Sequence, residues 1–118
     1  MGFMSHNAII VTSWEPEHLA IAHAKATEVF EQCHMEQLVS PAVGSIINGY
    51  HSFFVAPDGS KEGWVASGDG DRCRDEFVAW MASVADDVYL SWAEVQYGND
   101  DRISLLVRSE ADVDASDA

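Results

Sequence analysis

The spacing of hydrophobic positions separates strands from helices along this chain. Residues 6–13 centre on the apolar run IIV, which predicts a short strand. Residues 16–33 instead repeat apolar side chains every three or four positions, which predicts an amphipathic helix that extends at most to Gln37. Pro16 suits the first turn of this helix, and Ser13 is the predicted N-cap.

A β-hairpin is the predicted structure of residues 45–66. The stretch 46–56 is rich in β-branched and aromatic residues, which favours a strand. Pro57 to Ser60 predicts the turn, because proline pre-sets one dihedral angle and Asp-Gly tolerates a positive φ. Asn48-Gly49 is interpreted as a kink or bulge within the first strand.

The second half of the chain predicts one helix and a second hairpin. The helix is expected over residues 71–85, with Asp69 or Asp71 capping its N-terminus. Strands are expected over residues 88–97 and 102–108, joined by a turn. The tail is acidic and lacks aromatic residues, so residues 109–118 are expected to be disordered.

These elements follow the order β-α-β-β-α-β-β. Such an order predicts a single α+β domain over residues 1–108, a two-layer sandwich with two helices on one face of a mainly antiparallel sheet. Its first six elements match the ferredoxin-like split βαβ order, which is one candidate topology. Many unrelated functions use that topology, so it does not identify a function.

Charge limits the partners that the protein can bind. Twenty acidic residues stand against six basic ones, for a net charge of −14. Direct binding to nucleic acid or to an anionic membrane needs a basic surface, so neither is expected. A basic protein partner is favoured electrostatically, although acidity also serves solubility alone.

The two cysteines, Cys33 and Cys73, match no metal or redox motif. One disulfide is an option, but two free thiols in a reducing cytoplasm are the favoured interpretation. The N-terminal residues have no positive segment before their short apolar run, so no secretory signal is expected. The protein is therefore expected to be cytoplasmic.

No arrangement of residues in the sequence predicts catalysis, a metal or a cofactor. The five histidines lack helical ligand spacing, although His6 and His51 would meet if their strands were neighbours in that register. Asp69 and Asp71 superficially resemble a calcium loop, but helix capping explains them better. Cys73 lies between two arginines, which would lower its thiol pKa, but no orienting base accompanies it.

Two helices leave one face of a five-stranded sheet uncovered. Aromatic side chains on that face would form an apolar surface suited to a partner or to a second copy. The residues expected to bind a partner therefore combine acids and aromatics: Asp69, Asp71, Asp75, Glu76, Trp64, Tyr50 and Trp92.

The stretch SPAVGSIINGYHSFFVAPDGSKEGW, from Ser40 to Trp64, resembles small uncharacterised acidic proteins encoded by phages and prophages. That resemblance implies a non-enzymatic accessory protein that binds and inhibits a host protein in the host cytoplasm, in one version by mimicking DNA. The alternative is a small-molecule-binding or enzymatic domain with a pocket between helix and sheet, centred on His51, Tyr50 and Trp64.

Overall fold

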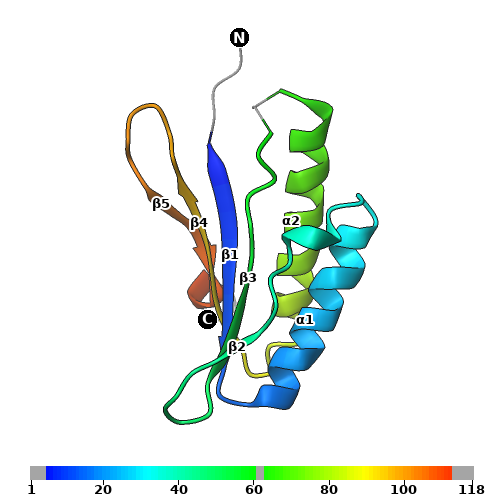
Figure 1. Ribbon diagram of the computed structural model, residues 1–118, viewed down its shortest axis with the longest axis vertical. Helices are drawn as coiled ribbons and strands as arrows, with labels where there is room; N and C mark the ends of the chain where they lie inside the picture. The colour runs from blue at the N-terminus through cyan, green and yellow to red at the C-terminus, as the bar shows by residue number, and fades with distance from the viewer. Residues whose placement is uncertain (1–4, 61–62, 113–118) are drawn as a thin grey trace.

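The computed structural model describes residues 5–60 and 63–112 of the chain. Two helices pack on one face of a five-stranded antiparallel sheet, so the predicted two-layer α+β class is confirmed (Figure 1). The elements are β1 (His6–Ser13), α1 (Pro16–Glu31), a 3-10 turn η1 (Glu36–Leu38), β2 (Val43–Gly44), β3 (His51–Val55), α2 (Val65–Ser83), β4 (Ser91–Tyr97) and β5 (Leu105–Ser109).

The strand order is β2-β3-β1-β4-β5. β3 lies between β1 and β2, which is the arrangement expected of a split βαβ unit, and β5 extends the sheet beyond β4. β1 is the central strand and pairs antiparallel with β3 on one side and with β4 on the other.

The hydrophobic core fills the space between the sheet and both helices. The predicted stripe of α1 is confirmed, since Leu19, Val29 and Phe30 are fully buried there. Its small residues, Ala22 and Ala26, are also fully buried, so the helix packs closely at these two positions. The core is completed by Ile9, Val11, Phe53, Val55, Cys73, Phe77, Val78, Met81 and Trp92.

The start of α1 differs from the prediction in its capping. Glu15 occupies the N-cap position and makes no side-chain cap hydrogen bond. The Ser13 hydroxyl instead accepts from the Glu15 amide at 3.1 Å and donates to the Tyr89 carbonyl at 2.5 Å. Ser13 therefore joins the end of β1 to the segment before β4. The helix ends at Glu31, and His34 turns the chain with a φ of 59°.

The predicted hairpin at Pro57 to Ser60 is wrong. β3 pairs with β2 instead, across a turn in which Asn48 and Gly49 have φ angles of 63° and 70°. Two consecutive positive φ angles are typical of the tight turns that match strand twist, and Asn-Gly adopts them most readily. The Ser45 amide closes this turn on the Tyr50 carbonyl at 2.7 Å.

The second helix begins six residues earlier than predicted. α2 starts at Val65, so Asp69 and Asp71 lie inside it and do not cap it. The glycines at 68 and 70 argue against helix in the sequence, because glycine costs about 1 kcal/mol relative to alanine there. The structure explains Gly70, whose missing side chain leaves space for the Asp58 carboxylate.

The C-terminal hairpin is confirmed, and it contains a bulge between Glu94 and Val95. The disorder expected from residue 109 is wrong at its start, because Ser109 ends β5 and residues 110–112 are helical. Residues 113–118 of the predicted tail lie outside the described part of the chain.

Candidate functional site: the open face of the sheet

The open face is the side of the sheet that faces away from α1 and α2 (Figure 1). Its side chains follow from strand alternation in β1, where Ile9 and Val11 are buried under the helices and Ile10 points the other way. The strand register places Phe54 of β3 and Ala93 of β4 beside Ile10. Ile10 is 47% exposed and Phe54 is 44% exposed, so both side chains are half uncovered.

A groove of about 540 Å³ runs across this face. Its lining is uncharged and mostly apolar: Ala8, Ile10, Ser40, Pro41, Val43, Ser52, Phe53, Phe54, Val95 and Tyr97. The few polar groups of the lining are largely engaged. The Ser52 hydroxyl is 2.8 Å from the Thr12 hydroxyl, and the Ser40 hydroxyl accepts from the Phe54 amide at 2.9 Å. The groove is therefore suited to contact with another apolar surface.

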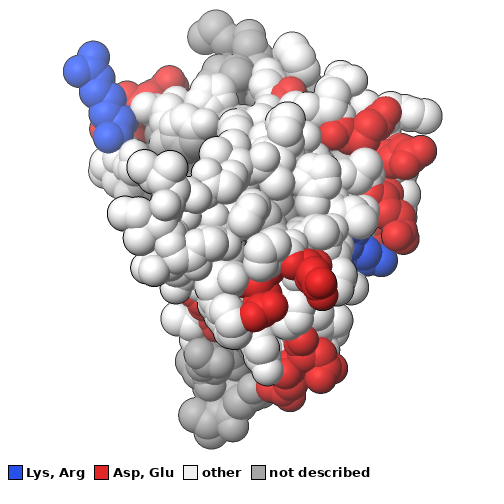
Figure 2. Space-filling view, turned by 60° about the horizontal axis from the view of Figure 1, so that its bottom comes forward, with Lys and Arg blue, Asp and Glu red and all other residues white. Residues whose placement is uncertain are grey.

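Acidic residues outnumber basic residues on the exterior of the protein. In Figure 2, which brings the lower end of the molecule forward, acidic side chains gather along the right edge and the lower part of the view, whereas basic side chains are scarce. Two of the six basic residues, Arg74 and Arg108, are largely turned inward, with side chains 6% and 28% exposed. The net charge of −14 is consequently carried by the exterior, while the groove lining carries none.

The structure does not bring the predicted partner-binding residues together. Trp92 is a core residue, only 6% exposed and turned toward the helices, so its prediction as a surface residue is wrong. Tyr50 is exposed in the turn before β3, and Trp64 is exposed just before α2. Figure 1 shows that this turn and the start of α2 lie at opposite ends of the molecule. The predicted pocket that combines Tyr50, Trp64 and His51 is therefore not formed.

Three of the four predicted acids bind arginines of the same chain. Asp69 contacts Arg72 at 3.1 Å, and Asp71 contacts Arg74 at 2.5 Å. Asp75 contacts Arg108 at 2.8 Å. The fourth acid, Glu76, is exposed on α2. These acids are part of the intramolecular charge balance, so they are poorer candidates for a partner site than the sequence suggests.

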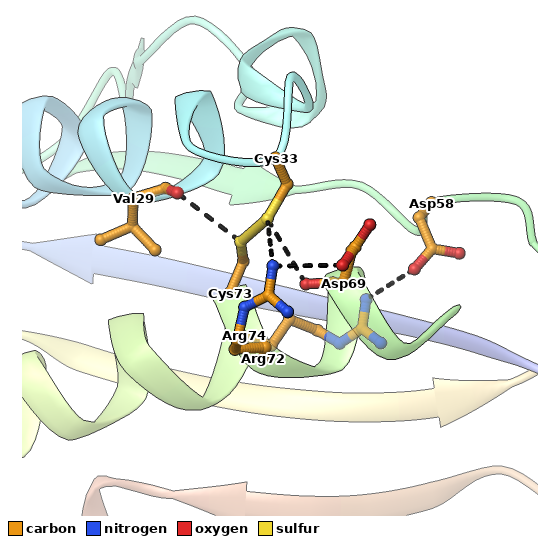
Figure 3. Close-up of a disulfide and its surroundings, with 7 residues drawn as sticks. All are labelled: Val29, Cys33, Asp58, Asp69, Arg72, Cys73 and Arg74. Carbon is orange, nitrogen blue, oxygen red and sulfur yellow. Dashed lines mark hydrogen bonds and ion pairs between the residues drawn. A yellow bond between two sulfur atoms is a disulfide. The ribbon is translucent and has the colours of Figure 1, made fainter. Parts of the chain in front are cut away.

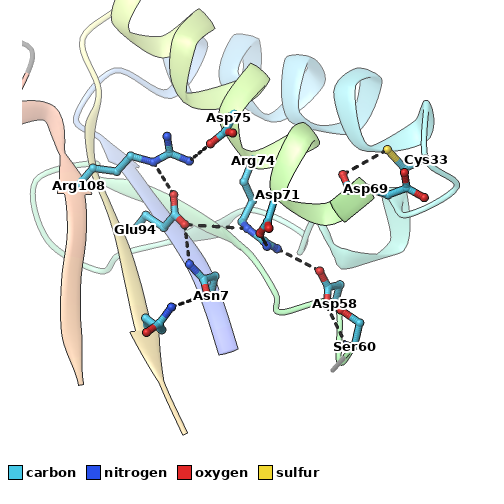
Figure 4. Close-up of polar contacts among 11 residues, drawn as sticks. Asn7, Cys33, Asp58, Ser60, Asp69, Asp71, Arg74, Asp75, Glu94 and Arg108 are labelled. Carbon is cyan, nitrogen blue, oxygen red and sulfur yellow. Dashed lines mark hydrogen bonds and ion pairs between the residues drawn. The ribbon is translucent and has the colours of Figure 1, made fainter. Parts of the chain in front are cut away.

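Arg74 and Arg108 belong to a buried polar network between α2 and the sheet (Figure 4). Glu94 of β4 is 2% exposed, and its carboxylate accepts from Arg108 Nε at 2.6 Å and from Asn7 Nδ2 at 2.8 Å. Arg74 lies 3.9 Å from Glu94 and donates to Asp58 at 3.2 Å. Every charge in this network has an opposite charge beside it, which is the condition for burying ions at tolerable cost.

Two members of the network have shifted pKa values. Burial alone would raise the pKa of the Asp58 carboxyl group, but hydrogen bonds from the Ser60 hydroxyl, the Ser60 amide and Arg74 outweigh burial and lower that pKa. Burial would lower the pKa of Arg108, but Glu94 and Asp75 raise it above its usual value. Both shifts favour the charged forms, as expected for a structural ion network.

Cys33 and Cys73 form a disulfide between the end of α1 and α2, so the interpretation as two free thiols is wrong (Figure 3). Forty residues separate them in sequence, and only the packing of the two helices brings them together. Arg72 lies 3.6 Å from the sulfur of Cys33, not from that of Cys73, its neighbour in sequence. A bonded sulfur cannot act as a nucleophilic thiolate, so this site is structural.

The described residues contain no group of three or more side chains arranged to hold a metal ion. The idea that His6 meets His51 is wrong, because His51 pairs with Ser13 at the far end of β1 while His6 pairs with Tyr97. Within residues 5–60 and 63–112, no helix combines the length and apolar character needed to cross a membrane.

The residues that line the groove were missed as a group by sequence reasoning, although a signal existed. IIV in β1 and FFV in β3 are unbroken apolar runs, so apolar side chains point to both faces of the sheet. Comparison of the chain with protein-family models, with curated proteins and with solved structures finds no match.

Proposed function

We propose that this protein is a non-enzymatic protein-binding module and that the open face of its sheet is the binding surface. The supporting observation is the groove of about 540 Å³ with an uncharged, mostly apolar lining. Contiguous apolar surface is costly to leave in water and typically marks a protein–protein contact. Half-exposed Phe54 and Tyr97 are the kind of aromatic anchors that dominate interface energetics.

The chemistry of the groove does not favour catalysis. Its lining has no carboxylate, no histidine and no thiol, and Tyr97 is its only side chain of the kind used in general acid–base catalysis, so a proton donor would have no partner base in the lining. Its hydroxyl groups at Ser40 and Ser52 are hydrogen-bonded to the backbone or to Thr12, and neither contacts a base. Binding without turnover is therefore the function that this surface supports best.

The acidic exterior adds an electrostatic preference to this binding. A net charge of −14 accelerates the approach of a basic protein and repels nucleic acids and anionic membranes. In the version in which the protein imitates DNA, exposed carboxylates would contact the basic groove of a host protein. The acids suited to such contacts are exposed and make no ion pair with any other described residue: Glu17, Glu31, Glu36 and Glu76.

Capture of partners from a bacterial lysate, identified by mass spectrometry, tests the proposed surface. We expect Phe54→Asp to abolish capture, because it places a charge in the apolar groove. Ile21→Asp is the matched control, since Ile21 is 48% exposed on α1, on the other side of the molecule. Equal capture by the two variants and by the unmodified protein, together with no self-association through this face, would refute the proposal.

Charge neutralisation tests the electrostatic part separately. Changing the four unpaired glutamates to glutamine removes charge without breaking an ion pair, whereas changing Asp71 or Asp75 would leave arginines unpaired. If acidic side chains contact a basic partner, this variant should bind at least tenfold more weakly, which is about 1.4 kcal/mol. Unchanged binding at low and high salt would show that the acids act only in solvation.

A further inference from the structure

We infer that the occupant of the open face is a second copy of this chain, so that two sheets pack face to face in a homodimer. The inference rests on the proposed function, because it names the partner of the same surface. Sheets that pack face to face lie about 10 Å apart and bury the side chains of both inner faces in a shared core.

Charge is the first argument for a second copy. A basic partner would be selected by carboxylates within the contact, yet the residues that line the groove include none. Two chains of net charge −14 repel each other in general, and they can pack only through a surface that is itself uncharged. The lining of the groove is such a surface. Glu110 lies at its border, where it lines a smaller hollow together with Ile10 and Ala93. Self-association is therefore permitted through the groove and opposed where the surface is acidic.

Area is the second argument. Five strands spaced about 4.8 Å apart make a face about 24 Å wide, and an average strand of about five residues of about 3.4 Å each makes it about 17 Å long. The flat projection is about 400 Å², and projecting side chains bring the accessible area closer to the roughly 800 Å² per partner of a standard stable interface. A contact of this size requires most of the open face, so it fits a second sheet better than a short peptide.

Shape is the third argument. An interface with two-fold symmetry must contain both a hollow and the projections that fill it, because each copy presents the same patch. The open face has both. Ala8 is only 4% exposed at the floor of the groove, whereas the neighbouring Ile10 and Phe54 are about half exposed. Ile10 lies on β1, the central strand, so a two-fold axis through the middle of the face passes close to it.

The mass of the purified protein in solution tests this inference directly. Light scattering during size-exclusion chromatography should give twice the chain mass of 12.9 kDa. Ile10→Glu and Ile10→Lys should each raise the dimer dissociation constant at least a hundredfold, because like charges would face each other across the axis. Mixing the two variants should restore a dimer, since a glutamate then faces a lysine.

Matched controls separate the face from general effects of charge. Ile21→Glu and Ile21→Lys make the same changes on α1 at nearly the same exposure, and both variants should remain dimeric. Circular dichroism should show that all four variants are folded. If an Ile10 variant does not fold, the Phe54→Glu and Phe54→Lys pair tests the same face. Added salt should strengthen the native dimer, because it screens repulsion between two acidic chains.

Two results would overturn the inference. One is that the protein stays monomeric at all protein and salt concentrations. In that case, if Phe54→Asp still abolishes lysate capture, the proposed function holds with another partner, such as a basic protein. The other is that all the variants at Ile10 and Phe54 remain dimeric, which would place the dimer contact on another surface. If lysate capture is also unaffected by Phe54→Asp, both the inference and the proposed function fail.

Discussion

The same substitution at two glycines of α2 should have opposite effects on stability. Gly68 and Gly70 both lie in the helix, but a Cβ at Gly68 would meet no atom within 4 Å. Gly68→Ala should therefore stabilise the protein by about 0.5–1 kcal/mol, through helix propensity and a less flexible unfolded chain. For a domain of this size, that corresponds to an increase of roughly 2–4 °C in melting temperature.

Gly70→Ala adds the same helix propensity but creates a clash. Its Cβ would overlap Oδ2 of Asp58 and lie 3.2 Å from Arg74 Nη1. The Asp58 side chain is 9% exposed and is held by Ser60 and Arg74, so it cannot move without losing a charged hydrogen bond. That loss costs about 1.5–3 kcal/mol, which should also be the difference in unfolding free energy between the two alanine variants.

Urea denaturation of the two variants and the unmodified protein measures this difference. A double-mutant cycle identifies its cause, because Asp58→Ala removes the carboxylate that the new methyl group would meet. In that background, Gly70→Ala should stabilise about as much as Gly68→Ala. If Gly70→Ala alone already stabilises the native protein as much as Gly68→Ala does, the close packing of Asp58 on α2 is refuted.

Two further predictions concern the buried network. Glu94→Ala should lower the unfolding free energy by about 3–5 kcal/mol, because it leaves Arg74 and Arg108 without a shared buried partner. Glu76→Ala is the control: this side chain is exposed, so its loss should change the unfolding free energy by less than about 0.5 kcal/mol. Equal effects of the two substitutions in urea denaturation would contradict the network. Asp58→Asn should be less stable than the native protein at neutral pH, and the difference should narrow below about pH 4. The folded-state pKa of Asp58 is lowered from 3.8, so its stabilising effect is present above that value and is lost as pH falls through the folded pKa. A gap that stays constant from pH 7 to pH 2 would contradict this assignment.

The proposed dimer would give the protein two distinct surfaces. The open face would be buried at the centre, and the helices, which carry Glu17, Glu31 and Glu76, would face outward on both sides. A basic partner, if one exists, would then meet two copies of the acidic surface rather than the groove. The face variants and the glutamate variants address these surfaces independently.

Local patterns in the sequence were sufficient for most elements of this fold. In α1 the apolar side chains repeat every three or four residues, and in β1 and β3 they form continuous runs. Both patterns reflect the direction in which successive side chains point in a helix or a strand, which is set within a few residues. The exposed open face follows from the same runs, since FFV in β3 has no polar residue to turn toward water. The two-layer class and the uncovered face were accordingly predicted before any contact was known.

Tertiary contacts decided what local patterns could not. The sequence SWAEV places Trp92 and Glu94 on one side of β4, and an acid normally indicates the exposed side. The structure buries both, because Arg74 and Arg108 supply the opposite charges from α2 and β5. Likewise, α2 runs through Gly70, where the Asp58 carboxylate occupies the space that a side chain would need. These choices depend on partners 12 to 20 residues away, so no local window of sequence contains the reason.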